Sequence, residues 1–214
     1  MNLPNALTVA RIALTPPVAL LPFLETATGR LAAFVLFVTA GLTDYFDGRL
    51  ARSRRDETDL GKILDPLADK LLLVGTFVPM YLLAQSGFRF VTPWGSVGLP
   101  MWIVVIVLGR ELFMAVFRQA AARRGVVIGA IGPAKWKTGM QLVWQGSAYF
   151  WFFAATLAAA QGWEGNRLWR AFADFNGIVG VTTMWVAVGL TLYSLWLYLR
   201  RYSGVFRQVT AGRR

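Results

Sequence analysis

Two residue types that often carry chemistry are missing from this chain of 214 residues, which has neither cysteine nor histidine. The absence of cysteine excludes disulfides and thiol nucleophiles. The absence of histidine excludes imidazole as a general base or a metal ligand. Any catalytic or metal site must therefore use carboxylate, hydroxyl, amine or water.

Charged residues are scarce as well, at 15% of the chain against 56% hydrophobic residues. This composition indicates an integral membrane protein, and we expect one domain over residues 1–214. Helices need roughly 20 apolar residues to cross a bilayer. Six segments fit, and none alternates with a period of two: 6–24, 32–47, 63–84, 99–117, 138–161 and 178–199. The sequence therefore predicts an all-α fold with six transmembrane helices.

The connections and prolines give further expectations. The start of the chain lacks a basic region and a cleavage site, so the first segment is expected to be a retained helix. Pro16 and Pro17 are expected to kink or break it, and Pro66 to make the turn at Asp65 irregular. Residues 85–98 are expected to form a loop, and 161–176 the longest polar connection.

The positive charge, +11 in total, is unevenly distributed. If both termini and the polar cleft are cytoplasmic, every basic residue except Arg30, Arg89, Arg167 and Arg170 falls on the cytoplasmic side. The positive-inside rule supports this orientation, that of a bacterial-type inner membrane. Basic residues that flank apolar spans also argue against nucleic-acid binding.

Four carboxylates at the junction of two apolar segments are the most informative feature. Ionisable groups at membrane depth are costly and suggest function. On each helix a small residue accompanies two carboxylates on one face, and Arg52 is placed to meet phosphate oxygens. A hard divalent cation, Mg²⁺ or Mn²⁺, suits such oxygen ligands, and two such ions would neutralise four carboxylates. Salt bridges to neighbouring basic residues are the structural alternative. The pattern comprises Asp44, Asp47, Gly48, Ala51, Arg52, Gly61, Asp65 and Asp69.

These eight residues match the signature of the CDP-alcohol phosphatidyltransferases, and the chain resembles that family. The resemblance implies a six-helix membrane bundle with a polar active-site cleft facing the cytoplasm. It also implies attack of an alcohol on the β-phosphorus of a CDP-linked alcohol, with release of CMP, and suggests a homodimer. By position, the metal ligands are Asp44, Asp47, Asp65 and Asp69, with Asp69 also the general base. The CDP site takes Asp44, Gly48, Ala51, Arg52 and Gly61.

Two further groups of residues could complete the site. Asn5 and Thr8 are placed to reach the cytosine, although Asn5 is equally suited to cap a helix. Arg110, Arg118, Lys135 and Lys137, with Glu111 and Gln141, resemble the branch of the family that acts on glycerol 3-phosphate. That branch usually has glycine where this chain has Ala134. A structural Arg110–Glu111 pair and lipid anchoring by the two lysines remain alternatives.

The expected reaction is therefore transfer of the phosphatidyl group from CDP-diacylglycerol to sn-glycerol 3-phosphate, giving phosphatidylglycerol phosphate and CMP. The alternatives within the family are cardiolipin, phosphatidylinositol-phosphate or phosphatidylserine synthesis. A divalent metal transporter is a remote alternative, because its carboxylates should line a path through the bilayer. Here the four carboxylates cluster at one face.

Overall fold

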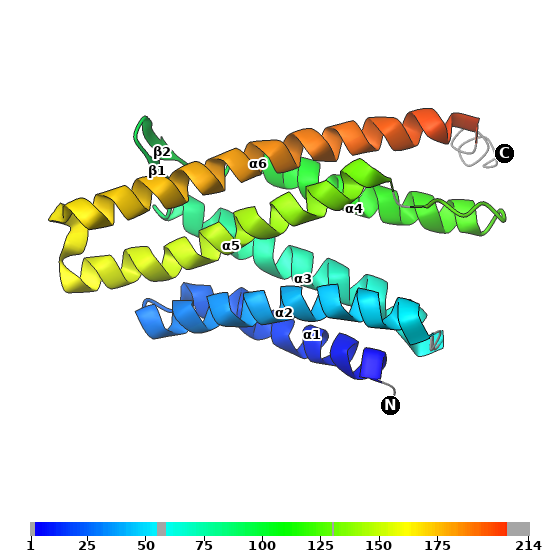
Figure 1. Ribbon diagram of the computed structural model, residues 1–214, viewed down its shortest axis with the longest axis horizontal. Helices are drawn as coiled ribbons and strands as arrows, with labels where there is room; N and C mark the ends of the chain where they lie inside the picture. Colours follow the sequence, from blue (N-terminus) through cyan, green and yellow to red (C-terminus); the bar gives the residue numbers. More distant parts are fainter. Residues whose placement is uncertain (1–2, 55–58, 130, 205–214) are drawn as a thin grey trace. The chain divides into compact units, whose positions relative to one another are not determined.

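The computed structural model describes the backbone of residues 3–54, 59–129 and 131–204; the side chains of 3–5, 44–54, 59–63 and 65 are outside the description. These ranges hold six α-helices: α1 (Leu3–Leu20), α2 (Ala27–Arg54), α3 (Asp59–Gln85), α4 (Met101–Ala122), α5 (Gly132–Gln161) and α6 (Arg167–Arg201) (Figure 1). Two 3-10 turns, η1 (Leu21–Phe23) and η2 (Trp163–Gly165), and a hairpin of β1 (Phe90–Thr92) and β2 (Gly95–Val97) complete the description. The expected all-helical architecture is confirmed apart from this hairpin.

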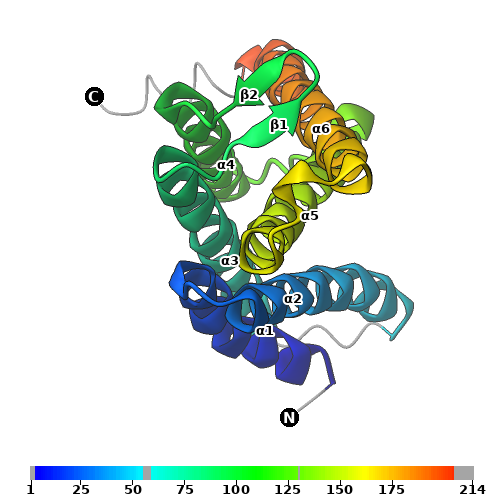
Figure 2. The ribbon, with the colours of Figure 1, turned by 90° about the vertical axis from the view of Figure 1, so that its left-hand side faces the viewer.

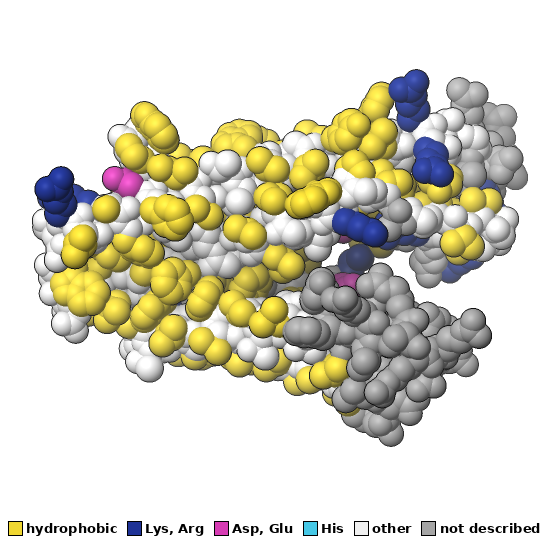
Figure 3. All heavy atoms as spheres, in the orientation of Figure 1, with side chains coloured by type: hydrophobic (Ala, Val, Ile, Leu, Met, Phe, Trp, Pro, Cys, Tyr) yellow, Lys and Arg dark blue, Asp and Glu magenta, His cyan; other side chains and the backbone are white. Residues whose placement is uncertain are grey.

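Three of the described helices are long and apolar enough to cross a membrane: Ala6–Phe23, Pro66–Gln85 and Arg167–Arg201. Ala27–Thr43 is a shorter apolar helix. The remaining two helices carry ionisable or polar residues within their apolar runs, such as Arg110 in α4 and Gln145 in α5. Hydrophobic side chains cover much of the surface seen in Figure 3, while lysine and arginine side chains gather toward helix ends. Both features suit a protein whose helices face lipid.

Several local expectations were wrong. Helix α1 is not broken at Pro16 and Pro17, so that only a kink there stays a prediction, and α3 is continuous through Pro66. Proline removes one backbone donor, but the remaining helical hydrogen bonds and apolar surroundings keep a membrane helix intact. The segment expected as a polar connection over 161–176 is already helical from Arg167 onward.

The described chain separates into two compact units. The first unit comprises Met1–Leu99 and Trp144–Gly180, and the second comprises Pro100–Val143 and Val181–Arg214. Helices α5 and α6 are each divided between the two units. The prediction of one domain over residues 1–214 stays a prediction.

In the first unit, α3 approaches α1 closely at Gly75. A Cβ atom on Gly75 would lie 2.8 Å from Cγ2 of Thr15, so glycine permits this contact. The buried Tyr149 of α5 donates its hydroxyl to the carbonyl oxygen of Val18 at 3.2 Å. Its ring stacks on Phe37 of α2, with 5.2 Å between the centroids. Tyr149 thus fastens α5 to α1 and α2.

The hairpin, in the region expected to be a loop, lies against the first part of α6 (Figure 2). Its strands are antiparallel, and Phe90 pairs with Val97. A Cβ atom on Gly177 would lie 1.6 Å from the carbonyl oxygen of Val91, and one on Gly180 would lie 2.4 Å from the Phe90 ring. Only glycine allows the hairpin backbone to approach the helix this closely.

A buried polar contact joins α5 and α6 in the same unit. Ser147 Oγ lies 3.0 Å from Oδ1 and 3.2 Å from the backbone oxygen of Asn176, and can donate to either. Asn176 Nδ2 donates to the backbone oxygen of Ser147 at 3.4 Å. Each side chain therefore satisfies polar groups of the other helix, as buried polar groups require.

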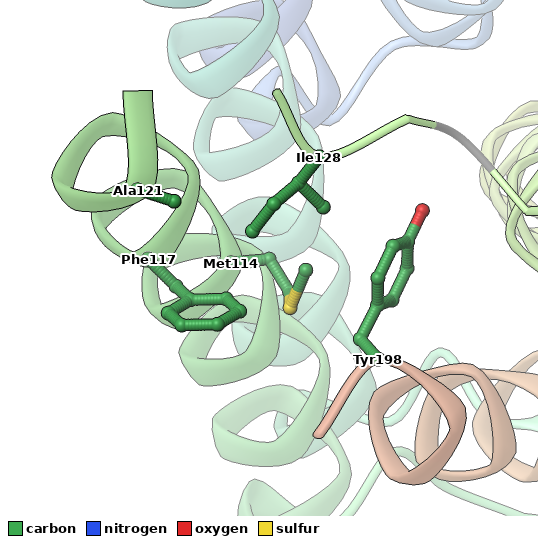
Figure 4. Close-up of a cluster of buried hydrophobic side chains, with 5 residues drawn as sticks. All are labelled: Met114, Phe117, Ala121, Ile128 and Tyr198. Carbon is green, nitrogen blue, oxygen red and sulfur yellow. The ribbon is translucent and has the colours of Figure 1, made fainter. Parts of the chain in front are cut away.

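In the second unit, α4, α6 and the segment before α5 share a small core (Figure 4). Met114, Phe117 and Ala121 lie on one face of α4, and Ile128 comes from the connecting segment. Tyr198 of α6 completes the cluster and is fully buried. This core positions the polar side chains of α4 and α6.

Candidate active site

Asp69, the expected general base, is paired with a cation in the first unit. Its Oδ1 accepts a hydrogen bond from Nη1 of Arg11 at 3.0 Å. The Arg11 side chain is only 3% exposed, whereas that of Asp69 is 55% exposed. The guanidinium therefore orients the carboxylate from the protein side, while Asp69 itself stays accessible to a reactant.

The packing of α1 on α3 explains this pair. Thr15 of α1 lies against Gly75 of α3. The paired residues Arg11 and Asp69 precede Thr15 and Gly75 on their respective helices, so the two helices run in the same direction. Thr15 also donates its hydroxyl to the backbone oxygen of Arg11 at 2.9 Å. The sequence alone did not identify Arg11 as the partner; the available signal was an ionisable residue within an apolar segment.

Most of the carboxylate signature lies outside the described side chains. Helix α2 contains Asp44, Asp47, Gly48, Ala51 and Arg52, and helix α3 contains Gly61 and Asp65. The metal and CDP assignments of these residues therefore stay predictions. The donor set fits a divalent cation by its chemistry, because it supplies oxygen ligands from two helices.

The two residues expected near the cytosine both belong to α1. This helix begins at Leu3, so Asn5 lies within the helix rather than capping it, and its side chain is outside the description. Thr8 is buried, with 2% of its surface exposed. It precedes Arg11 by one helical turn and so shares a face with it.

A second polar cluster lies in the second unit and is centred on Glu111. Arg110 Nη1 donates to Oε1 of Glu111 at 2.8 Å, and Lys137 Nζ donates to the same oxygen. The side chains of Arg110 and Lys137 are 5% and 4% exposed, and that of Glu111 is 20% exposed. One carboxylate thus serves two buried cations, which leaves an excess of positive charge.

Two side chains of α6 form hydrogen bonds with arginines of α4. Arg110 Nη2 donates to Ser194 Oγ at 3.1 Å, and Arg118 Nη2 donates to the Tyr198 hydroxyl at 3.1 Å. Ser194 and Tyr198 are four residues apart, so they share a helix face. Neither was identified from the sequence, although this spacing of polar groups in an apolar helix was a usable signal.

Two buried donors near this cluster have no partner among the described residues. They are Nε of Arg110 and Nε2 of Gln141, which follows Lys137 by one turn of α5. Buried donors are normally satisfied, so these atoms are available to a bound ligand. Together with the surplus positive charge they favour an anion with several oxygen acceptors.

Three of the four residues expected to bind the acceptor phosphate are associated in the second unit: Arg110, Arg118 and Lys137. Lys135 is exposed like Arg118, but unlike Arg118 it makes no hydrogen bond or ion pair with the cluster among the described residues. Residues two apart on a helix do not share a face, so the burial of Lys137 turns Lys135 away from the cluster. Lys135 is therefore the better candidate for lipid anchoring.

Comparison with known proteins adds independent information. The sequence pattern of the family described as CDP-alcohol phosphatidyltransferase matches residues 1–193. A CDP-diacylglycerol–glycerol-3-phosphate 3-phosphatidyltransferase of Rickettsia bellii is 32% identical over 199 residues, covering 93% of this chain and 94% of that protein. The protein of that name from Bacillus subtilis is 32% identical over 212 residues and covers 94% of both chains. An Arabidopsis thaliana protein, CDP-diacylglycerol–glycerol-3-phosphate 3-phosphatidyltransferase 2, is 29% identical over 94% of this chain and 79% of its own length.

Proposed function

The chain belongs to the CDP-alcohol phosphatidyltransferase family, and we propose that it makes phosphatidylglycerol phosphate. The reaction transfers the phosphatidyl group of CDP-diacylglycerol to sn-glycerol 3-phosphate and releases CMP. Relatives similar over nearly the whole chain carry this activity in their names. The observation in the structure that carries the acceptor assignment is the positively charged buried cluster of Arg110, Lys137 and Glu111.

The donor half of the reaction rests on the carboxylate signature. Asp44, Asp47, Asp65 and Asp69 would hold Mg²⁺ or Mn²⁺, and Gly48, Ala51, Arg52 and Gly61 would line the CDP site together with Asn5 and Thr8. When bound, the ions stabilise the negative charge of the diphosphate. The four carboxylates supply the oxygen ligands that both ions prefer.

Asp69 takes the proton of the acceptor. The hydroxyl oxygen of glycerol 3-phosphate forms a new bond to the β-phosphorus, and the bond from that phosphorus to the oxygen of the CMP phosphate breaks. The hydroxyl proton passes to the Asp69 carboxylate, whose oxygen Oδ1 is held by Arg11. The partial exposure of Asp69 supports this role, because a general base must come within hydrogen-bond reach of the proton that it takes.

The acceptor phosphate is held by Arg110, Arg118 and Lys137, and Glu111 keeps two of these cations in place. Two arginines and one lysine provide several charge-assisted donors for phosphate oxygens. Serine lacks such a phosphate, and phosphatidylglycerol carries its phosphate as a diester with less charge. The cluster therefore favours a phosphomonoester acceptor.

The membrane arrangement forms part of the same proposal. Six helices cross the inner membrane, both termini and the active site face the cytoplasm, and the protein acts as a homodimer. The asymmetric charge of the sequence supports the orientation. Three apolar helices of sufficient length support a membrane location.

The test is an acceptor screen with purified full-length protein, CDP-diacylglycerol and Mg²⁺ or Mn²⁺, with CMP release as the readout. We expect turnover with sn-glycerol 3-phosphate and none with serine or phosphatidylglycerol; inositol phosphate completes the screen. Removal of the cation with EDTA should stop turnover, and adding it back should restore it. Turnover with serine or phosphatidylglycerol alone would show that the acceptor assignment is wrong.

A further inference from the structure

Tyr198 lies at the meeting point of three parts of the second unit. It is fully buried, among Met114 and Phe117 of α4 and Ile128 of the segment before α5. In Figure 4 its ring stands beside these apolar side chains, and its hydroxyl points toward the connecting segment. A phenylalanine would fill the same apolar space, so the hydroxyl is what distinguishes tyrosine at this buried position.

The hydroxyl uses its full hydrogen-bonding capacity. It accepts from the backbone N–H of Ile131 at 3.1 Å and from Nη2 of Arg118 at 3.1 Å. It also donates to the backbone oxygen of Gly129 at 3.2 Å. A phenol has one donor and two acceptor positions, so this single oxygen ties Arg118 to the segment that leads into α5.

The ring of the same residue lies near both arginines of the acceptor cluster. The guanidinium carbon of Arg118 is 5.5 Å from the ring centroid, and that of Arg110 is 5.9 Å away. Both distances are within the range of cation–π attraction. One turn earlier on α6, the hydroxyl of Ser194 accepts a hydrogen bond from Arg110.

These contacts fix the arginines before a ligand arrives. A long arginine side chain loses rotamer freedom when it binds an anion, and a side chain that is already held loses less. Each guanidinium has five N–H donors, so the bond to Tyr198 or Ser194 leaves capacity for phosphate oxygens. Arg118 is otherwise exposed, and Tyr198 is the contact that restrains it.

We propose that Tyr198 is a positioning residue for the acceptor phosphate: it holds Arg118 through its hydroxyl and both arginines through its ring. This proposal rests on the proposed function, because it assigns the cluster to the phosphate of the acceptor. Tyr198 acts only through the arginines and does not touch the reacting atoms.

The test is Tyr198→Phe, which removes the hydroxyl and keeps the ring. We expect the KM for sn-glycerol 3-phosphate to rise roughly five- to tenfold, as for loss of one ordinary hydrogen bond. The kcat and the KM for CDP-diacylglycerol should remain close to those of the unaltered protein. Tyr202→Phe is the matched control, because Tyr202 packs against the same core and stacks on Tyr198, yet should leave both KM values unchanged.

Binding of inorganic phosphate, measured by titration calorimetry, provides a readout that does not depend on the acceptor. Tyr198→Phe should weaken it by a similar factor. An unchanged KM and unchanged phosphate binding would overturn the proposal. So would a loss of kcat and of both affinities together with a lower melting temperature, which indicates a structural role alone. If the unaltered protein fails to use glycerol 3-phosphate, the proposed function is wrong, and the phosphate titration still decides the role of Tyr198.

Discussion

Replacement of Glu111 by glutamine should destabilise the protein more than replacement of its partner Lys137. The substitution Glu111→Gln keeps the size and one acceptor oxygen of the side chain but removes its negative charge. Arg110 and Lys137, which are 5% and 4% exposed, then share a neutral partner. Buried cations that lose their counter-charge are costly, because water cannot replace it.

The structure sets the size of the effect. Breaking a buried ion pair typically costs about 3–5 kcal/mol, and the 20% exposure of the Glu111 side chain favours about 3 kcal/mol here. For a chain of this length that corresponds to a fall in melting temperature of roughly 6–12 °C. Lys137→Met leaves the bond between Arg110 and Glu111 intact and removes one buried cation, so it should cost less, about 1 kcal/mol.

The assay is thermal unfolding of the purified variants in one detergent at constant ionic strength. Inorganic phosphate should raise the melting temperature of Glu111→Gln more than that of the unaltered protein, because the substituted cluster is more positive. The double variant Glu111→Gln with Lys137→Met should recover part of the lost stability. If Lys137→Met proves as damaging as Glu111→Gln, then the two cations do not depend on one shared carboxylate, and the reasoning fails.

Three further predictions concern catalysis, the acceptor and the hairpin. Asp69→Asn should abolish CMP release while metal-dependent binding of CDP persists in a nucleotide-binding assay; full activity would exclude Asp69 as the base. Lys137→Ala should raise the KM for glycerol 3-phosphate by roughly tenfold or more, whereas Lys135→Ala, at an exposed position of the same helix, should leave it unchanged in the CMP assay. Gly177→Ala should lower the melting temperature by an amount equivalent to about 1–3 kcal/mol, because its Cβ meets hairpin backbone. Gly189→Ala in the same helix meets nothing within 4 Å and should be neutral or slightly stabilising.

The helices were predictable from the sequence because each needs a long apolar run. The third and fourth segments, expected at 63–84 and 99–117, correspond to α3 at Asp59–Gln85 and α4 at Met101–Ala122. The hairpin was missed because its strands have three residues each, too few for an alternating pattern to be recognised. Pro16 and Pro66 were given too much weight, because the penalty for proline in a helix is set by its surroundings.

Some contacts near the candidate site could be expected from the sequence and others could not: an Arg110–Glu111 pair was one interpretation of the sequence, and the two side chains are hydrogen-bonded at 2.8 Å. The sequence identified Asp69, yet its contact with Arg11 depends on the register of α1 and α3, which Gly75 sets. It also grouped Lys135 with Lys137, because a repeat of lysines does not say which of them faces inward. Only the packing of α5 distinguishes the buried lysine from the exposed one.

The contact between Ser147 and Asn176 has a consequence for biogenesis. Asn176 lies in a helix that is otherwise apolar enough to span the membrane, and an amide facing lipid without a partner is unfavourable. Its hydrogen-bond partner, Ser147, belongs to the preceding helix α5, and only a short connection separates α5 from α6 along the chain. Helices α5 and α6 are therefore suited to leave the insertion machinery as one hairpin, with the amide already satisfied before either helix meets lipid alone.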